Sequence, residues 1–355
     1  MRKLVTLRKV SKLIPIEGKD VIELAEIDGW QCIVKKGEFA VGDYGFYFEC
    51  DSVIPINRPS FEFLKKSEKT HLLMDDEYMP IEFTGARIKT MKMGGVVSQG
   101  LLLPVDVLNT KNKPVDVSKL SEEKDYSSAF GVVKYEKYVK LGGESKGSFP
   151  WFLSKSDQER VQNIKQPFFD ACLNDDVEIS IKLDGSSLTA FYIPTDAQKY
   201  GVGGDGDSYF GVCSRNQEIT ESNDSIFWQV VNNQNILEKL KTFGRPIAIQ
   251  GELVSPKIQG NYEKVDQAKL FVYNVFDIES GKYLPTDTWT FDDYVPVLFR
   301  GRLSQFCYDR PDLIEKSDGQ GLNVGVKREG IVVKQVNNNW SFKVISKSYL
   351  LHKKD

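Results

Sequence analysis

The sequence predicts an α+β protein of two domains, a small β-barrel followed by a larger domain that mixes strand hairpins with helices. The chain has 355 residues, a length that suggests two domains. Its first 110 residues contain several short apolar runs separated by glycine turns, which is typical of a small barrel. Residues 151–355 combine such runs with an amphipathic segment over 224–242, which indicates strands and helices together.

The predicted barrel covers residues 1–110. Its clearest hairpin has strand-like runs at 21–27 and 30–34 on either side of the turn Asp28-Gly29. Further strands are expected at 41–48, 87–93 and 98–103, and the charged stretch 59–80 is expected to be an excursion between strands. Arg87, Lys89 and Lys92 alternate with apolar residues, which would place positive charge on an exposed face of the barrel.

Residues 111–150 are predicted to be a linker. Lys111–Pro114 is rich in turn formers, a short helix could start near Ser121, and Gly142–Ser148 has the composition of a flexible loop. Such a segment would connect two independently folded domains.

The second predicted domain covers residues 151–355. It opens with Ser156-x-x-Glu159, a capping box that predicts the start of a helix. The segment 224–242 is expected to be a helix with one apolar stripe in the core. Strands are expected at 178–192, as a hairpin around Asp184-Gly185, at 247–254 and 270–278, and at 328–335 with 339–345, with helical material over 288–309.

Composition excludes several classes of function. A net charge of −3 argues against a basic coat that binds nucleic acid all over, so any such contact must be local. The five scattered cysteines form no Cys-x-x-Cys pair, which indicates core thiols in a reducing compartment such as the cytoplasm or nucleus. The only histidines, His71 and His352, lie near no hydrolase signature. No run of about 18 apolar residues predicts a membrane span.

The stretch with the strongest chemical signal is Lys182-Leu-Asp184-Gly185. Lys182 lies between two apolar residues at the mouth of the predicted hairpin, so it is either an edge-strand charge or a nucleophile. Desolvation and nearby cations can lower the pKa of a lysine from about 10.4 far enough to leave some neutral amine at pH 7. Taken alone, the tetrapeptide supports only a hairpin with a polar tip.

The order of residues downstream changes that interpretation. From about Ser156 to Leu351 the chain resembles the covalent nucleotidyltransferase superfamily of ATP-dependent ligases and capping guanylyltransferases. As a whole it is similar to the Naegleria type of RNA ligase, which carries an OB-fold domain in front of the nucleotidyltransferase domain. The resemblance is carried by Arg160-Val-Gln-Asn, the Lys182 motif, Arg215 in Ser-Arg-Asn, Glu252 in Gln-Gly-Glu-Leu, Phe276 in Val-Phe-Asp-Ile, Glu329 in Glu-Gly-Ile-Val-Val-Lys334 and Lys343 in Ser-Phe-Lys-Val.

The resemblance implies a fold and a reaction. The fold would be an OB-fold β-barrel that contacts RNA, followed by an adenylyltransferase domain of the ligase type with ATP-grasp-like antiparallel sheets and helices. The reaction would be ATP-dependent sealing of RNA ends that carry a 3′-hydroxyl and a 5′-phosphate. Lys182 would attack the α-phosphorus of ATP, and AMP would then pass from the lysine to the 5′-phosphate of the RNA.

The resemblance also implies roles for single residues. Asp184, Glu252 and Glu329 would hold Mg²⁺ or Mn²⁺, in part through water. Cofactor-binding residues besides Lys182 and Glu252 would be Arg160 at the ATP phosphates, Gly185 in the nucleotide-binding turn, Arg215 at the ribose or the acceptor phosphate, Phe276 stacked on adenine, Lys334 at the AMP phosphate and Lys343 at the α-phosphate. Tyr273 or Phe271 could replace Phe276 as the stacking ring. Many members of the superfamily have a second lysine where this chain has Ile345, and Lys347 lies too far along the strand to replace it.

Three alternatives share part of these motifs. Capping guanylyltransferases and DNA ligases also use Lys-x-Asp-Gly, but they usually carry their OB domain after the catalytic one. A non-catalytic RNA-binding protein on an old ligase scaffold would not need to keep Lys182, Asp184, Glu252 and Glu329. We therefore expect a monomeric RNA ligase that is not bound to a membrane.

Overall fold

The computed structural model describes residues 3–74, 80–93, 95–109, 114–136, 145–202 and 208–352. The chain divides into two compact units, Met1–Lys140 with Lys354–Asp355, and Leu141–Lys353. No helix in these described ranges is both long enough and apolar enough to cross a membrane. All five cysteines are buried and none forms a disulfide.

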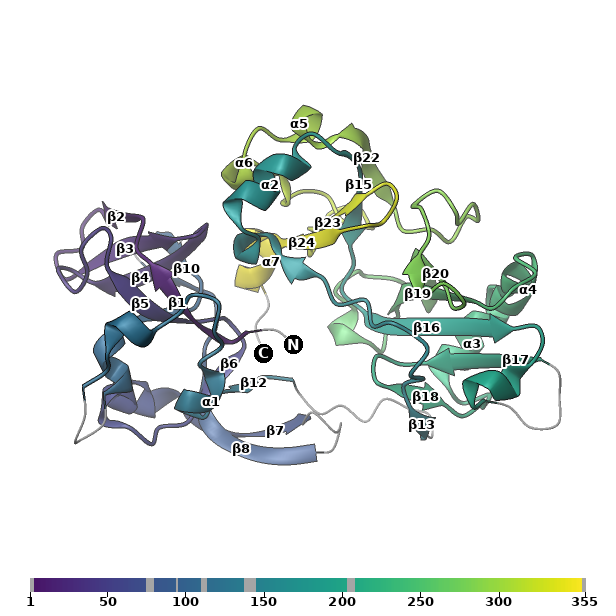
Figure 1. Cartoon of the computed structure of the whole chain (residues 1–355), viewed down its shortest axis with the longest axis horizontal. Helices are drawn as coiled ribbons and strands as arrows, with labels where there is room; N and C mark the ends of the chain where they lie inside the picture. The colour runs from purple at the N-terminus through teal and green to yellow at the C-terminus, as the bar shows by residue number, and fades with distance from the viewer. Residues whose placement is uncertain are drawn as a thin grey trace. The chain divides into compact units, whose positions relative to one another are not determined.

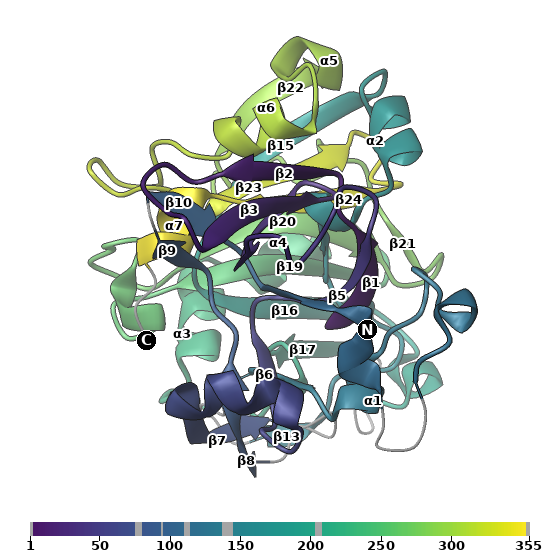
Figure 2. The same ribbon diagram turned by 90° about the vertical axis from the view of Figure 1, so that its left-hand side faces the viewer.

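The first unit is built from short antiparallel strands. They form sheets in the orders β1-β5-β11, β2-β3-β4, β12-β6-β8-β7 and β9-β10; Figure 2 shows β2 and β3 as neighbouring purple arrows. The strands are β1 (Val5–Lys9), β2 (Lys12–Pro15), β3 (Ile22–Ile27), β4 (Trp30–Lys35), β5 (Tyr44–Phe48), β6 (Ser52–Ile54), β7 (Glu68–Met74), β8 (Pro80–Arg87), β9 (Met91–Met93), β10 (Val96–Ser98), β11 (Leu101–Pro104) and β12 (Val133–Lys134).

Three of these elements refine the expected barrel. The hairpin across Asp28-Gly29 is confirmed, since β3 and β4 pair with Ile27 opposite Trp30. The predicted excursion at 59–80 instead holds the 3₁₀ helix η1 (Pro59–Ser67) and β7, which pairs with β8. Arg87 does not lie on a solvated face, because it is 2.7 Å from Asp51 and its guanidinium lies 3.6 Å from the ring centre of Tyr135.

Residues 114–136 of the segment predicted as a linker contribute to the core of the first unit, whereas its residues 145–148 form a strand of the second unit. Helix α1 (Ser127–Phe130) follows the short 3₁₀ helices η2 (Val105–Leu108) and η3 (Val117–Lys119). The Phe130 ring centre lies 5.1 Å from those of both Phe46 and Phe48, at tilted or edge-on angles. Edge-on aromatic pairs add about 0.5–1.5 kcal/mol each beyond the area they bury. Residues 114–136 therefore pack as part of the first unit.

The second unit contains two sheets (Figure 1). The seven-stranded sheet has the order β13-β18-β17-β16-β19-β20-β21 and the five-stranded sheet the order β14-β24-β23-β15-β22. The strands are β13 (Ser145–Ser148), β14 (Glu159–Arg160), β15 (Asp176–Lys182), β16 (Ser186–Ile193), β17 (Tyr209–Cys213), β18 (Gln217–Ile219), β19 (Ile247–Val254), β20 (Lys269–Asp277), β21 (Lys282–Tyr283), β22 (Val297–Arg302), β23 (Gly330–Gln335) and β24 (Ser341–Ile345).

Helices and 3₁₀ turns flank and connect these sheets. Helices α3 and α4 pack on the seven-stranded sheet through an apolar cluster that includes Phe227, Val231 and Leu240. The elements are η4 (Val161–Asn163), α2 (Gln166–Cys172), η5 (Ala197–Tyr200), α3 (Ile226–Asn233), α4 (Ile236–Lys241), η6 (Gln259–Asn261), α5 (Leu303–Phe306), α6 (Arg310–Lys316) and α7 (Lys347–His352).

The predicted hairpin around Asp184-Gly185 is wrong in its pairing. β15 pairs with β22 and β23, whereas β16 pairs with β17 and β19, so the two strands lie in different sheets. The commonest turn of an Asp-Gly hairpin needs positive φ at both central residues, and neither Asp184 nor Gly185 has one. Lys182 consequently lies at the junction of the two sheets.

Other predicted elements of the second unit are confirmed or shifted. Strands β19 and β20 confirm the expected strands, and β23 pairs antiparallel with β24 as predicted. The helix expected over 224–242 is broken into α3 and α4 at Asn235, whose φ is 52°. The capping box at Ser156 starts no helix, since β14 and η4 follow it and α2 begins at Gln166. The region 288–309 contains β22 before the short α5.

Candidate functional site

The five-stranded sheet gathers cationic side chains on one face. Lys182 lies opposite Gly330, and Lys343 lies opposite Val332 on one side and Arg160 on the other. Residues directly opposite each other, and residues two apart along one strand, share a face of a sheet. Lys182, Lys343, Arg160 and Lys334 therefore share one face, while the apolar side chains of the opposite face pack on α2 and α6.

Gly185 lets the turn after Lys182 approach the seven-stranded sheet. Its amide donates a hydrogen bond to Glu252 Oε1 over 3.0 Å. A Cβ at this position would lie 2.5 Å from the carbonyl oxygen of Leu253, which is closer than real Cβ contacts allow. The glycine of the motif thus joins the end of β15 to β19, which carries Glu252.

Lys182 makes an ion pair at this junction. Its Nζ lies 2.7 Å from Oε2 of Glu329, and the two side chains are 23% and 11% exposed. Burial alone would lower the pKa of Lys182, but Glu329, Glu252 and Asp184 together raise it above its usual value. The expectation that desolvation lowers this pKa is therefore wrong for the unliganded chain, because three acids surround the amine.

Glu252 is a partly buried acid beside that amine. Burial raises the pKa of Glu252 to about 7, although the charge of Lys182 acts in the opposite direction. The carboxylates of Glu329 and Asp184 add to the rise. Three acids and one lysine thus share a site in which one further positive charge would be strongly favoured.

Two residues that the sequence did not single out hold Asp184. The amide of Asp184 donates to Glu263 Oε1 over 2.9 Å, and the hydroxyl of Tyr349 on α7 hydrogen-bonds to the Asp184 side chain. Burial raises the pKa of Glu263 to about 7. Glu263 is a single carboxylate in a loop, and no pattern in the sequence could have shown that it returns to the Lys182 turn.

The predicted metal ligands fit an ion that is held through water. No three acids, cysteines or histidines of the described ranges lie close enough together to hold an ion directly. Mg²⁺ in proteins keeps several of its waters. Asp184, Glu252 and Glu329, which all act electrostatically on Lys182, are hard oxygen donors of the type that Mg²⁺ and Mn²⁺ prefer. Their role as metal ligands stays a prediction.

The three candidate stacking rings take different positions on β20. Phe271 lies opposite Glu252, whereas Phe276 lies opposite Ala248, four residues further along β19. Phe276 is 4% exposed and its ring centre lies 5.2 Å from that of Tyr283, in a core cluster. Tyr273 is half-buried at a bulge in β20, where its hydroxyl lies 2.9 Å from Ser156 Oγ. Adenine stacking by Phe276 stays a prediction.

Lys334 is more enclosed than its predicted role suggests. It is 1% exposed, and its Nζ donates to Asn274 Oδ1 over 2.8 Å and to the carbonyl of Tyr273. Lys334 lies opposite Glu178, four residues from the position of Lys182 on β15. Contact with the AMP phosphate would use the third N–H of the Lys334 ammonium or replace one of these two acceptors.

Arg215 and Ile345 complete the set of predicted positions. Arg215 lies 2.8 Å from Asp157, and both side chains are largely exposed. Ile345, where many relatives of the superfamily would have a lysine, is 6% exposed and lies opposite Gly330. Ile345 lies on the same face of the sheet as Lys182 but adds no charge there. Lys343, two residues before Ile345 on β24, and Arg160, opposite Lys343, are the cations near it on this face.

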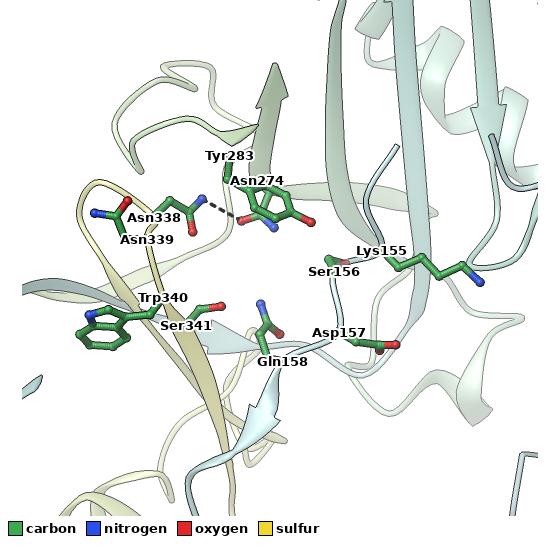
Figure 3. A pocket seen from close by; sticks show the side chains of 10 residues that line it. All are labelled: Lys155, Ser156, Asp157, Gln158, Asn274, Tyr283, Asn338, Asn339, Trp340 and Ser341. Atoms are coloured by element: carbon green, nitrogen blue, oxygen red, sulfur yellow. Dashed lines mark hydrogen bonds between the residues drawn. The ribbon is translucent and has the colours of Figure 1, made fainter. Parts of the chain in front are cut away.

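A separate polar pocket lies at the Lys334 end of the sheet (Figure 3). Its volume is about 200 Å³. Figure 3 shows that Asn338 reaches towards Asn274, and their side chains are 3.5 Å apart. The lining consists of Lys155, Ser156, Asp157, Gln158, Asn274, Tyr283, Asn338, Asn339, Trp340 and Ser341. Lys182 is not among these residues, so the pocket and the acid cluster are distinct features.

Comparisons with known families divide the chain in the same order as the two units. An OB-fold domain family matches residues 4–105. A family described as RNA ligase matches residues 175–348, which include the Lys182 motif, Glu252, Phe276, Glu329 and Lys343. A comparison with curated protein sequences gave no match.

Solved structures of Naegleria gruberi RNA ligase are similar over nearly the whole chain. A glutamate-to-alanine variant with ATP and Mn is 33% identical with a TM-score of 0.80, and the alignment covers 98% of each chain. A second such variant with AMP and Mn has the same values. The same ligase with PPi is 33% identical with a TM-score of 0.79, over 99% of this chain and 98% of that one. The predicted fold class is confirmed.

Proposed function

This chain belongs to the RNA ligase family, and on that basis we propose that it is an ATP-dependent ligase that seals 3′-hydroxyl and 5′-phosphate RNA ends. One observation carries the proposal. The amine of Lys182 lies 2.7 Å from Glu329 at the junction of two sheets, and Glu252 and Asp184 also act on it. The similar Naegleria ligase, solved with ATP, AMP or PPi, supports a nucleotide at this junction.

In the first step Lys182 Nζ attacks the α-phosphorus of ATP. A nitrogen–phosphorus bond forms while the bond to the bridging oxygen breaks, and the electron pair leaves with pyrophosphate. The Lys182 ammonium must lose a proton before it can attack, and the carboxylate of Glu329 is in position to accept it. Arg160 and Lys343, on the same face, would offset the charge of the phosphates.

Asp184, Glu252 and Glu329 would hold Mg²⁺ or Mn²⁺ through water, and the bound ion would neutralise charge on the α-phosphate. The acids themselves keep the Lys182 turn in place: Glu252 binds the amide of Gly185. Phe276 would stack on adenine, and Arg215 would contact the ribose or the acceptor phosphate. Lys334 would contact the AMP phosphate with its third N–H or in place of Asn274.

The later steps act on RNA. A 5′-phosphate oxygen attacks the lysyl-AMP and frees Lys182, and a 3′-hydroxyl then attacks the adenylylated end and releases AMP. The first unit, which matches an OB-fold domain family, would hold the RNA. We further propose that the protein acts as a monomer in the cytoplasm or nucleus, where its buried thiols stay reduced.

Incubation with α-labelled ATP or GTP and Mg²⁺ tests the proposal. ATP should label the wild-type chain, and Lys182→Ala should abolish the label. Labelling from GTP would instead indicate a capping enzyme, and labelling from neither nucleotide would indicate a non-catalytic RNA-binding protein. Sealing of a nicked RNA duplex in preference to a nicked DNA duplex separates RNA ligase from DNA ligase.

A further inference from the structure

Two carboxylates, one of them fully buried, bind two successive amides of the turn that follows Lys182. Glu252 accepts from the amide of Gly185 over 3.0 Å, and Glu263 accepts from the amide of Asp184 over 2.9 Å. Glu252 comes from β19, whereas Glu263 comes from the loop 258–265 that follows it. Glu263 is 1% exposed and has no part in the reaction described so far.

The loop that carries Glu263 has an unusual backbone. Gln259, Asn261 and Lys264 have φ of 49°, 54° and 52°, values that are uncommon for residues other than glycine. The Asn261 side chain holds the loop closed, because it binds both the amide and the carbonyl of Val265, over 2.9 and 3.0 Å. Backbone conformations of this kind persist only where surrounding contacts impose them, and they are frequent at functional sites.

The same loop is tied to the segment that leads into Glu329. Asn323 donates to the carbonyl oxygens of Glu263 and Lys264 over 2.8 and 3.1 Å. The hydroxyl of Tyr262 donates to the carbonyl of Lys327 over 2.7 Å. The loop thus links the turn after Lys182 to the segment that precedes Glu329, the ion-pair partner of Lys182.

We infer that Glu263 is a positioning residue that fixes the Lys182–Gly185 turn through the amide of Asp184, so that the Lys182 amine points at the α-phosphorus. This inference rests on the proposed function. Glu263 Oε1 accepts the hydrogen bond from the amide of Asp184. The backbone amide of Leu322 also acts on this carboxyl group and lowers its pKa. The role inferred for Glu263 is therefore to hold the geometry of the turn.

The two chemical steps distinguish a role of Glu263 in positioning Lys182 from a general effect of Glu263 on the stability of the fold. Lysine adenylylation needs the Lys182 nitrogen in line with the leaving pyrophosphate, whereas sealing of an RNA nick that is already adenylylated forms no bond to Lys182. A displacement of about 1 Å at a reacting group can cost about 10²-fold in rate. Loss of the Glu263 contact should therefore slow the first step much more than the second.

The experiment compares single-turnover rates of both steps in the full-length chain. Glu263→Ala should lower the maximal rate of Lys182 adenylylation about 10- to 100-fold, with half-saturating ATP changed by less than about 3-fold. Glu263→Gln should restore the rate to within about 3-fold of wild type, because the side-chain oxygen of glutamine can still accept a hydrogen bond from the amide of Asp184. Sealing of the pre-adenylylated nick should fall by less than about 3-fold in both variants.

Glu178→Ala is the matched control. Glu178 is also 1% exposed and lies on β15, but it binds Tyr294 and Arg300 at the other end of that strand. This variant should lower the melting temperature without separating the two rates. A wild-type rate in Glu263→Ala, an equal loss of both steps, or no rescue by Glu263→Gln would each overturn the inference. Failure of the wild-type chain to label at all would instead overturn the proposed function.

Discussion

Lys182 and Lys334 lie on the same face of one sheet, four strand positions apart, yet their surroundings are opposite. Lys182 faces a carboxylate at 2.7 Å, with two more acids acting on it. Lys334 faces two neutral oxygens, Asn274 Oδ1 at 2.8 Å and the carbonyl of Tyr273. Burial acts to lower the pKa of both lysines, but it prevails only at Lys334, whose pKa falls to about 8 despite the charge of Glu178.

The comparison shows that the more acidic lysine is not the proposed nucleophile. Lys334 loses its proton more easily, but it is 1% exposed and its amine already donates to Asn274 and to the carbonyl of Tyr273. Lys182 keeps its proton until substrate arrives, and its side chain is the more exposed of the two, so substrate can reach it. The arrangement of acids thus matters more than the resting pKa, since bound phosphate and metal ion would change the charge around Lys182 during the reaction.

The largest expected effect comes from making Lys182 resemble Lys334. Glu329→Gln removes the charge that faces the amine but keeps a side-chain oxygen of the same size. The pKa of Lys182 should fall, because burial is no longer outweighed as strongly. Lysine adenylylation should slow by about 10²- to 10⁴-fold through loss of the proton acceptor. Single-turnover labelling and an NMR titration of isotope-labelled lysine measure the two effects.

Glu238→Gln controls for loss of a negative charge elsewhere. Glu238 lies 2.7 Å from Lys241 on the surface of α4, where both side chains are exposed. That variant should change neither the labelling rate nor the Lys182 titration. Unchanged labelling in Glu329→Gln would show that proton transfer to Glu329 is not part of the step.

The second effect is a dependence of stability on pH that belongs to Lys334. Its folded pKa of about 8 lies below the unfolded value of about 10.4, so the unfolded chain binds more protons between these values. Stability conferred by this group is therefore lowest below pH 8 and rises with pH through this window. Relative to Lys334→Met, the wild-type chain should gain about 1.5 kcal/mol in free energy of unfolding between pH 8 and 9.5. Urea unfolding at the two pH values measures it.

Lys241→Met serves as the reference for that measurement, because Lys241 is exposed and its pKa is raised by its hydrogen bond to Glu238. It should show no gain over the same pH range. The difference in unfolding free energy between Lys334→Met and wild type could instead stay constant from pH 8 to 9.5. Lys334 would then be protonated in the folded state over this range, and water would have to reach its two neutral acceptors.

Part of this site was predicted from the sequence, in two different ways. Lys182, Asp184 and Gly185 are adjacent in the chain, whereas Glu252, Glu329 and Lys343 were assigned to the site by the resemblance to the nucleotidyltransferase superfamily, because their spacing cannot show that they meet. The register of β15, β23 and β24 then brings Lys182 and Lys343 to one face. Motif order and strand patterns carry that information.

The features that were missed depend on contacts distant in sequence. The pairing of β15 and β16 with different sheets is decided by their other neighbours, and the turn sequence alone favoured a hairpin. Glu263 reaches Asp184 across 79 residues, through a loop whose left-handed residues have no strong sequence signature. The core role of Tyr126 and Phe130 was hidden because isolated aromatic residues in a polar segment resemble a linker.

The smallest expected effect concerns a third cation, Arg215, whose acid partner is exposed. Arg215 lies 2.8 Å from Asp157, and the side chains are 46% and 67% exposed. An exposed ion pair contributes at most about 1 kcal/mol, so Asp157→Asn should leave the melting temperature nearly unchanged. If Arg215 contacts the nucleotide, release from Asp157 should lower half-saturating ATP by about 2- to 3-fold, as steady-state labelling can measure.

Salt provides the internal check on that effect. Exposed charges more than about 10 Å apart are largely screened near 0.1 M salt, and a contact pair is weakened further at 1 M. The difference between Asp157→Asn and wild type should therefore shrink as salt rises. Asp292→Asn, at a fully exposed acid 3.9 Å from Lys239, is the control and should leave half-saturating ATP unchanged. Weaker ATP binding in Asp157→Asn would mean that Asp157 holds Arg215 in its productive position, and the pair would then be part of the site.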